Sequence, residues 1–220
     1  MRLLHAWMRN WYYVGGVIFA AMAILIALFA DAIDPMRRIM MALFMCLLLH
    51  EFEEYAAPGG FPSAWNAGVS GAGEDADRFP LNAKSAFIVN VCCVYPIYIL
   101  GIVLSGVHFL SIVIAYMTMA QVLMHGIVMN RKMGTLYNPG VVTAAFVMVP
   151  VGIYALWFIG TSFDIPSWYW WAALATCPFI VALTIALPIR ACQDENSPHV
   201  FPERDTRGFS IKGKVARLRR

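Results

Sequence analysis

Charged residues are scarce in this sequence. Asp, Glu, Lys and Arg make up only 13% of its 220 residues, and hydrophobic residues make up 60%, whereas a soluble domain has about a quarter of its residues charged and about half apolar. The mean hydropathy is +0.66, and apolar runs of about 20 residues recur along the chain. This composition excludes a soluble domain and predicts an all-α fold, a polytopic membrane bundle of about six transmembrane helices.

Signals of several common kinds of site are also missing. The five cysteines have no zinc-type C-x-x-C spacing, so they are expected to pack as small hydrophobic side chains. The methionines form no regular Met-x-x-Met ladder, which argues against a copper site. The Gly-rich, acidic segment 66–79 lacks a phosphate-loop pattern and is expected to be either a plain loop or a lid. Nothing in the sequence predicts a nucleic-acid partner.

The apolar segments themselves predict six spans. They cover residues 12–30, 36–57, 85–105, 107–130, 139–160 and 168–188, and each is about long enough to cross a hydrocarbon core of about 30 Å. The predicted organisation is a transmembrane domain over residues 1–190 and a basic tail over 191–220. The first apolar stretch is longer than the roughly 7–15 residues of a signal-peptide core, so it is expected to be retained.

Basic residues predict the orientation of these spans. In the six-span topology, all of the 16 Lys and Arg residues except Arg37 and Arg38 fall on one side of the membrane. The positive-inside rule then places both termini in the cytoplasm, with the chain in the inner (plasma) membrane. The basic tail is expected to be attracted to anionic lipid headgroups.

Three ionisable side chains interrupt the apolar character of the second span. A charge near the bilayer centre costs about 2.5–3.5 kcal/mol on insertion scales, so such residues usually face a bundle interior and carry function. At about 100° per residue, His50, Glu53 and Glu54 fall within an arc of about 100°, while Glu51 is expected to point elsewhere. One face of this helix therefore presents an imidazole and two carboxylates.

Other spans are expected to bring polar groups to the same depth. In the predicted topology, Asn90 on the third span and His125 and Gln121 on the fourth lie near the depth of His50. The segment Tyr137-Asn138-Pro139-Gly140 predicts the start of the fifth helix on the same side, with Asn138 as cap and Pro139 as the first helical residue. The free N–H groups of such a helix start can receive a phosphate, a carboxylate or a developing oxyanion.

These motifs resemble those of the HXXEE family of bacterial membrane proteins. The family motif is similar to His50-Glu51-Phe52-Glu53-Glu54, and His125 with the later Tyr-Asn-Pro-Gly segment looks like its second motif block. The resemblance extends over about residues 40–185 and leaves the basic tail outside. It implies a shared site and supplies no reaction, because the family has no established activity.

The first functional prediction is a metal-dependent intramembrane enzyme of hydrolase type. The predicted metal ligands are His50, Glu53, Glu54 and His125, with Glu53 and Glu54 also the predicted catalytic carboxylates and Gln121, Asn90, Tyr137 and Asn138 around them. Two histidines and a carboxylate are typical of catalytic zinc centres that keep a position open for water. The expected cofactor is therefore a divalent metal, zinc first, with iron or manganese as alternatives. A site at acyl-chain depth predicts a lipid, an isoprenoid or another membrane-embedded substrate.

Three alternatives stay open at this point. In a metal-free hydrolase, Glu53 or Glu54 activates water and His125 stabilises an oxyanion; this is similar in outline to the glutamate intramembrane proteases, whose motif has Arg where Pro58 stands. In a proton-coupled transporter, the same groups form a proton relay. In a structural or assembly factor, the cluster only fixes helix packing. The lipid bilayer is the expected partner, and the oligomeric state stays open.

Overall fold

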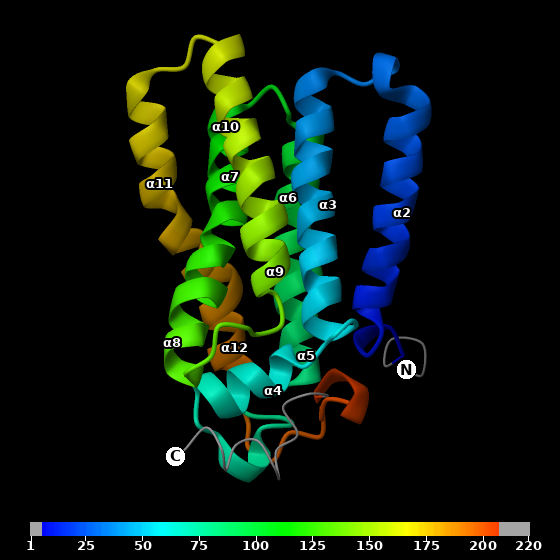
Figure 1. Cartoon of the computed structure of the whole chain (residues 1–220), viewed down its shortest axis with the longest axis vertical. Helices are drawn as coiled ribbons and strands as arrows, with labels where there is room; N and C mark the ends of the chain where they lie inside the picture. The colour runs from blue at the N-terminus through cyan, green and yellow to red at the C-terminus, as the bar shows by residue number, and fades with distance from the viewer. Residues whose placement is uncertain (1–5, 207–220) are drawn as a thin grey trace.

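The computed structural model describes residues 6–206, and this part of the chain is a bundle of six long helices without strands (Figure 1). Two of the long helices are single: α2 (Trp11–Phe29) and α3 (Pro35–Tyr55). The other four each contain a π-helical stretch: α5–η4–α6 (Ala83–Phe87, Ile88–Val94, Tyr95–Val103), α7–η5–α8 (His108–Val122, Leu123–Met129, Asn130–Met133), α9–η6–α10 (Val141–Thr143, Ala144–Met148, Val149–Ser162) and α11–η7–α12 (Ser167–Val181, Ala182–Ala186, Leu187–Cys192).

Five of these helices are long and apolar enough to cross a membrane, and α3 is the exception. It has 21 residues, enough to span, but it carries Arg37 and Arg38 in its first turns and three glutamates in its last turns. These charges are compatible with a membrane because α3 is central: it packs against α2, α6, α7 and α10, and 14 of its residues are buried. The prediction of an all-α membrane bundle of about six spanning helices is confirmed.

The four π-helical stretches all lie in the same half of the bundle. Each is in the half of its helix nearer to the end at which residues 56–82 and 193–206 gather, the lower end in Figure 1, which we call the site end. Three of them are followed by a proline at the second residue of the next α-helical part: Pro96, Pro150 and Pro188. Proline lacks an N–H donor and clashes with the preceding turn, and a wider turn relieves this conflict.

The segment after α3 folds into a cap across the site end. It contains α4 (Phe61–Ser63), the π-helical η2 (Ala64–Val69) and the 3-10 helix η3 (Gly73–Asp75). The fully buried Asn66 holds the cap, because its amide donates to the carbonyls of Ala76 (3.0 Å) and Leu81 (2.7 Å) and accepts from the N–H of Leu81 (3.0 Å). The predicted loop 66–79 is therefore a folded element.

Residues after α12 also return to the site end and include the 3-10 helix η8 (Glu203–Thr206). Tyr12 donates a hydrogen bond to the buried Asp205 (2.6 Å), and Arg204 donates to the carbonyl of Arg9 (2.5 Å) and to Asn10 Oδ1 (2.8 Å). Part of the predicted basic tail thus packs on the bundle. Residues 207–220, which carry the expected headgroup contact, lie outside the described residues.

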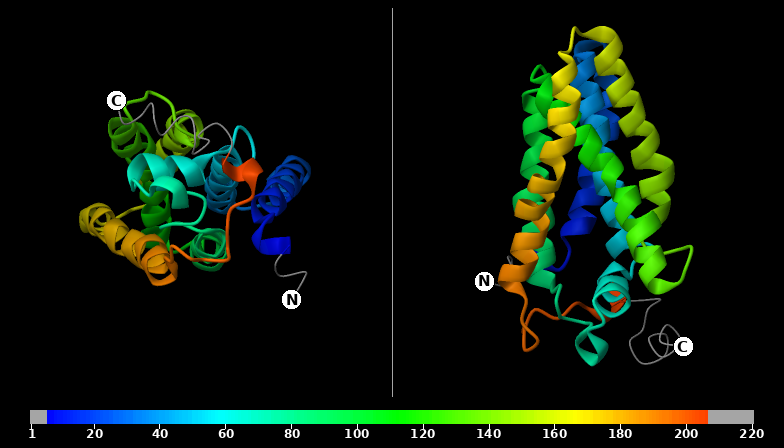
Figure 2. Two further views of the ribbon diagram at one scale, coloured as in Figure 1. Left: turned by 90° about the horizontal axis from the view of Figure 1, so that it is seen from below. Right: turned by 90° about the vertical axis from the view of Figure 1, so that its left-hand side faces the viewer.

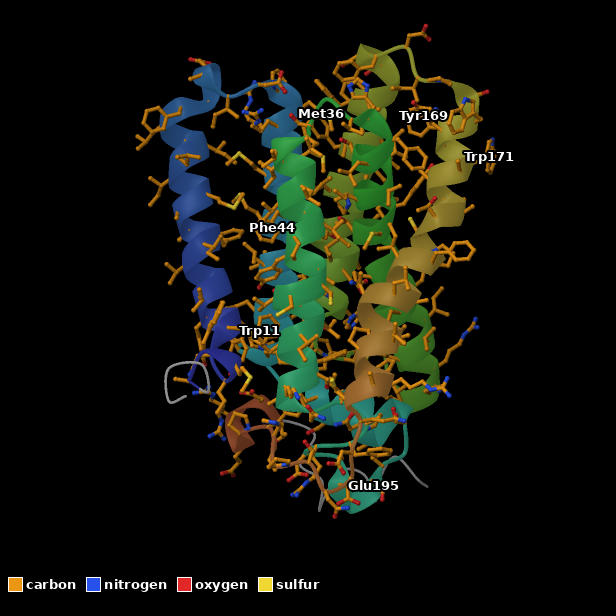
Figure 3. All side chains as sticks on the ribbon, turned by 180° about the vertical axis from the view of Figure 1, so that it is seen from behind. Trp11, Met36, Phe44, Tyr169, Trp171 and Glu195 are labelled. Carbon is orange, nitrogen blue, oxygen red and sulfur yellow. The ribbon has the colours of Figure 1, made fainter. Side chains whose placement is uncertain are left out.

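Aromatic residues mark both ends of the bundle. Figure 3 shows Trp11 toward the site end and Tyr169 and Trp171 at the opposite end, on helices α2 and α11. Trp171 is 74% exposed, so its ring is available to the surrounding lipid interface. Such belts are typical of spanning helices.

Candidate functional site

Three of the predicted ligand residues converge in the half of the bundle nearer to the site end. His50 and Glu54 come from the last turns of α3 and His125 comes from η5, and all three are buried. Glu54 Oε1 lies 3.2 Å from His125 Nε2 and 3.7 Å from His50 Nε2. The two imidazole rings meet edge to face with their centroids 4.8 Å apart. One ligand atom from each residue lies within 4.8 Å of the others, so the three side chains can hold a metal ion.

Hydrogen bonds fix the tautomer of His125. Asn138 Nδ2 donates to the carbonyl of His125 (2.8 Å) and to Asn130 Oδ1 (2.8 Å), which turns Asn138 Oδ1 toward His125 Nδ1 at 2.7 Å. This oxygen can only accept, so Nδ1 of His125 carries a proton and donates it. In the neutral ring, Nε2 then presents its lone pair to Glu54.

Thr143 and Glu53 fix the tautomer of His50 in the same way. The hydroxyl of Thr143 donates to Glu53 Oε2 at 2.5 Å, and its Oγ1 lies 2.9 Å from His50 Nδ1. Because the only hydroxyl hydrogen is used toward Glu53, Oγ1 accepts the Nδ1 proton of His50. The neutral His50 therefore also directs its Nε2 lone pair toward Glu54.

Gly140 provides the space in which the two rings meet. Its φ of +104° is a left-handed conformation that favours glycine. A Cβ at this position would lie 2.5 Å from Cε1 of His125 and 2.9 Å from Cε1 of His50. A side chain here would push both imidazoles out of place, so the Tyr-Asn-Pro-Gly segment is part of the site through its glycine.

Glu53 lies outside this three-residue group. Its carboxylate accepts hydrogen bonds from the N–H groups of Val142 (3.3 Å) and Thr143 (2.7 Å) at the start of α9. A helix N-terminus favours a negative charge, and here the anion is a side chain of the protein itself. Glu53 therefore reaches the site only through Thr143.

The predicted start of this helix was wrong in detail. The helix begins at Val141 with Gly140 at the N-cap position, and the predicted cap Asn138 precedes it. The physical reason is that the amide of Asn138 is fully used by His125 and Asn130, so it has no bond left for capping. The predicted first helical residue, Pro139, also lies before the helix.

The remaining predicted residues lie near the group in different roles. Gln121 and Asn90 line the cavity beside it, and Asn90 Nδ2 donates to the carbonyl of Ala86 at 3.1 Å. Tyr137 is 42% exposed and lies between α8 and α9. Partial burial and the negative charge of Glu53 raise the pKa of Tyr137, so its phenol stays protonated.

A cavity of about 260 Å³ lies against the His50, Glu54 and His125 side chains. Its other walls are mostly apolar side chains of α3, η2, η4, α7, η5, η7 and α12. Among the described residues, no Lys or Arg lines it. The cavity therefore combines a polar end, formed by the His/Glu group, with an apolar body.

The cavity lies where two helices separate. The first part of α11 packs against α7, whereas η7 and α12 pack against η4 and α5. Pro178 inside α11 and the π-helical η7 that follows are the usual causes of such a change of direction. The right-hand view of Figure 2 shows α8 and α12 diverging toward the site end. Leu123 and Val128 in the cavity wall are 55% and 39% exposed, so this part of the wall also belongs to the outer surface of the bundle.

The sequence predicts that Glu51 points elsewhere than His50 and Glu54, and Glu51 does lie outside the three-residue group, bonded to Tyr95 of α6. Its place in the cavity wall was not predicted. Glu51 lines the same cavity as His50 and Glu54 and is only 1% exposed. Tyr95 donates to its Oε2 at 2.5 Å, while its Oε1 is buried without a hydrogen-bond partner. The available signal was the spacing of three residues to Glu54, which places both carboxylates on neighbouring positions of one helix face.

Comparison with known proteins agrees with the motif. The family model described as "Protein of unknown function with HXXEE motif" matches residues 41–155, which is 115 of the 220 residues. This range contains all the residues of the three-residue group and their hydrogen-bond partners. No curated protein and no solved structure gives a significant match.

Proposed function

The chain belongs to the HXXEE family, a family of unknown function, and from the geometry of its site we propose that it is a metal-dependent intramembrane enzyme of hydrolase type. In this proposal His50, Glu54 and His125 hold one divalent ion. Glu53 is a positioning residue, which acts on His50 through Thr143.

The observation that carries the proposal is the convergence of three acceptor atoms in a buried place. The Nε2 atoms of His50 and His125 and the Oε1 atom of Glu54 face one another, and a proton or a cation is needed between them. Both Nδ1 atoms have oxygen partners, Thr143 and Asn138. Metal-ligating histidines almost always donate their other ring N–H to such a partner.

The distances suit a small ion with tetrahedral ligands. Ligand atoms about 2.0–2.1 Å from a tetrahedral ion lie about 3.3–3.4 Å from each other. The separations from Glu54 Oε1 to the two Nε2 atoms are 3.2 and 3.7 Å, and all three ligand atoms lie within 4.8 Å of one another, so a bound ion would draw them closer together. Three protein ligands leave a position for water, as in catalytic zinc sites. Zinc is therefore the first candidate, and iron or manganese suits the same donor set.

The surroundings support hydrolysis of an apolar substrate. A bound divalent ion supplies Lewis acidity and lowers the pKa of a coordinated water. The cavity beside the group has an apolar body, and part of its wall is exposed on the outer surface of the bundle, which suits a lipid, an isoprenoid or another membrane-embedded molecule. The protein groups hold the ligands in place and exclude bulk water, because His50, Glu54 and His125 are all buried.

We also propose that the site end faces the cytoplasm. Lys84, Arg131 and Lys132 lie at this end, whereas Arg37 and Arg38 lie at the other. The positive-inside rule then places the start of α2 and residues 193–206 on the cytoplasmic side of the plasma membrane.

The proposal is tested by the metal content of the purified protein. We expect one divalent ion per chain in the wild type and none in Glu54→Gln, because the amide keeps the shape and removes the charged ligand. Glu195→Gln is the matched control, since Glu195 is exposed at the site end (Figure 3), and it is expected to keep the ion. A wild type that purifies without a stoichiometric ion, and takes up none on titration, rejects the metal centre.

A metal-free hydrolase is the second candidate, and one observation favours it. Glu54 and His125 are already within 3.2 Å, close enough to share a proton without an ion between them. Hydrolytic activity on a lipid ester that persists after complete removal of metal by a chelator favours this candidate. Activity that is lost on chelation and restored by zinc favours the metal centre.

A further inference from the structure

One carboxylate oxygen of Glu51 has no hydrogen-bond partner. Its side chain is 1% exposed, and Tyr95 satisfies Oε2, but Oε1 is buried with no hydrogen-bond partner. A buried polar atom without a partner costs free energy, and such atoms are few in folded proteins. Since Glu51 lines the cavity, a bound molecule is a natural source of the missing donor.

The other two glutamates of the motif differ from Glu51 in this respect. Glu53 accepts from Val142 and Thr143, and Glu54 faces His50 and His125. Glu51 is also outside the three-residue group that can hold an ion. Its unpaired oxygen therefore has no structural or metal-binding use among the described residues.

A second unpaired atom lies in the same cavity wall. The indole Nε1 of Trp65 is buried without a hydrogen-bond partner, and Trp65 lines the cavity with Glu51. The cavity thus offers an unpaired acceptor and an unpaired donor. A hydroxyl group both donates and accepts, so it matches a cavity whose wall contains both kinds of unpaired atom.

We propose that Glu51 Oε1, with Tyr95 as positioning residue, binds the hydroxyl group of an uncharged amphiphile whose apolar chain occupies the cavity. The proposal rests on the proposed function, because it assigns a substrate class to the same cavity. A phosphate or free carboxylate head group is not matched, since no Lys or Arg of the described chain lines the cavity. The cavity of about 260 Å³ is near the lower end of the usual range of about 300–1,000 Å³ for ligand pockets, which suits one chain.

The rest of such a chain is expected to follow the wall that η5 shares with η7 and α12, which includes Leu123, Val128, Ile185 and Ile189. These helices diverge toward the site end in the right-hand view of Figure 2. Leu123 and Val128 in this wall are also partly exposed on the surface of the bundle. A long chain can therefore lie partly in the cavity and partly among the lipid tails, with its hydroxyl at the Glu51 end. The reactive bond of the substrate would then lie near the His/Glu group, because Glu51 and Glu54 line the same cavity.

The test compares three probes of one chain length, each brominated on a carbon close to the head group: dodecanol, its methyl ether and dodecyl phosphate. The ether cannot donate a hydrogen bond, and the phosphate is an anion. Binding to the full-length protein in nanodiscs is measured by quenching of tryptophan fluorescence. Loss of part of the quenching in Trp65→Phe locates the probe in the cavity, because Trp65 is in its wall.

We expect the wild type to bind the alcohol roughly tenfold or more tightly than the ether, because the ether leaves the buried Oε1 of Glu51 without a hydrogen-bond partner. Glu51→Gln keeps the shape but turns an amide N–H₂ toward the cavity while Tyr95 donates to its oxygen, so the preference is expected to vanish or reverse. Tyr95→Phe is expected to reduce the preference. The matched control is Tyr98→Phe, because Tyr98 is also buried and bonded, to Thr118, but does not line the cavity.

Equal binding of alcohol and ether by the wild type, or tightest binding of the phosphate, would overturn the inference. A folded Glu51→Gln protein that still prefers the alcohol as strongly as the wild type would also overturn the inference. If Glu51→Gln does not fold, the same result in Tyr95→Phe would overturn it. Metal content is measured on the same samples. A preference for alcohol in protein that binds no ion rejects the metal centre alone, whereas an ion without such a preference rejects the Glu51 subsite alone.

Discussion

The two halves of this bundle are built differently. In the half nearer to the site end, four of the six long helices contain a π-helical stretch, and all the buried His, Asp and Glu residues of the described chain lie there: His50, Glu51, Glu53, Glu54, His125 and Asp205. In the opposite half the helices are α-helical, and their buried side chains are mostly apolar, such as Leu43, Ile112 and Ile159. The half with π-helical stretches is therefore also the half that contains the buried ionisable residues and the candidate site.

The difference shows how a membrane bundle accommodates ionisable groups. Such groups are tolerated where neighbouring protein encloses them and supplies hydrogen bonds. The π-helical stretches redirect side chains within otherwise regular helices, and they occur frequently at functional sites. His125 lies inside such a stretch, so the irregular backbone is what presents its ring to α3.

The same lesson applies to the three glutamates at the end of α3. They are close in sequence and all buried, yet Glu53 binds a helix start, Glu54 faces two histidines and Glu51 faces the cavity. Neighbouring elements, rather than the motif itself, assign these roles. Substitutions can test whether the two halves of the bundle have separate roles, one in metal binding and one in packing.

The largest expected effect comes from the two histidines of the α7–η5–α8 helix. His125→Ala, in the half with the site, is expected to abolish stoichiometric metal binding, because it removes one of three ligands. His108→Ala, at the opposite end, is expected to leave the metal content unchanged, since His108 packs against the ring of Phe163 far from the three ligands. Elemental analysis of both purified variants makes the comparison, and equal metal content would refute the assignment.

A smaller but still large effect is expected for Gly140→Ala. The new Cβ would overlap both imidazoles, and overpacking costs about 1–3 kcal/mol in addition to roughly 1–2 kcal/mol for the left-handed backbone. Both the thermal midpoint and the metal affinity should fall. Gly106→Ala is the matched control, because nothing lies within 4 Å of its added Cβ; a similar loss in both variants would mean that Gly140 has no special role.

An intermediate effect is expected for Thr143→Val. The valine keeps the shape and removes the oxygen that accepts from His50 Nδ1, and loss of such a partner typically weakens metal affinity about 10–100-fold. Thr143→Ser should restore most of the affinity, because it keeps the hydroxyl. Zinc titration with a competing chelator measures all three proteins, and a Val variant as tight as wild type would contradict the tautomer argument.

The smallest effect on the site is expected from the opposite half. Ile159→Val removes one buried methylene, which typically costs about 0.5–1.5 kcal/mol of stability. The thermal midpoint should fall slightly while metal affinity stays at the wild-type value. A drop in metal affinity comparable to that of Thr143→Val would show that the two halves are not separable.

Much of the architecture was predictable because hydropathy is a property of composition. The apolar runs predicted about six spanning helices, and the polar interruption of the second span pointed to His50 and Glu54. The position of His125 at the same depth followed from the predicted topology together with the helix rise. These inferences need only the regular geometry of an α-helix.

The remaining features depend on departures from that geometry and on tertiary contacts. A π-helical turn rotates every later residue of a helix to a different face. The 3.6-residue period of an α-helix therefore does not predict which side chains of such helices are in contact. The separate roles of Glu53 and Glu51 depend on where α9 begins and where Tyr95 lies. The folded cap depends on the three hydrogen bonds of Asn66, and the periodicity of the sequence does not predict them.

The most direct test of the central claim is X-ray absorption spectroscopy of the zinc-loaded wild-type protein. The account predicts one zinc ion bound by two imidazole nitrogens and at least one oxygen, with the imidazole signal reduced in His125→Ala. A protein that binds no zinc, or binds it without imidazole ligands, would contradict the account.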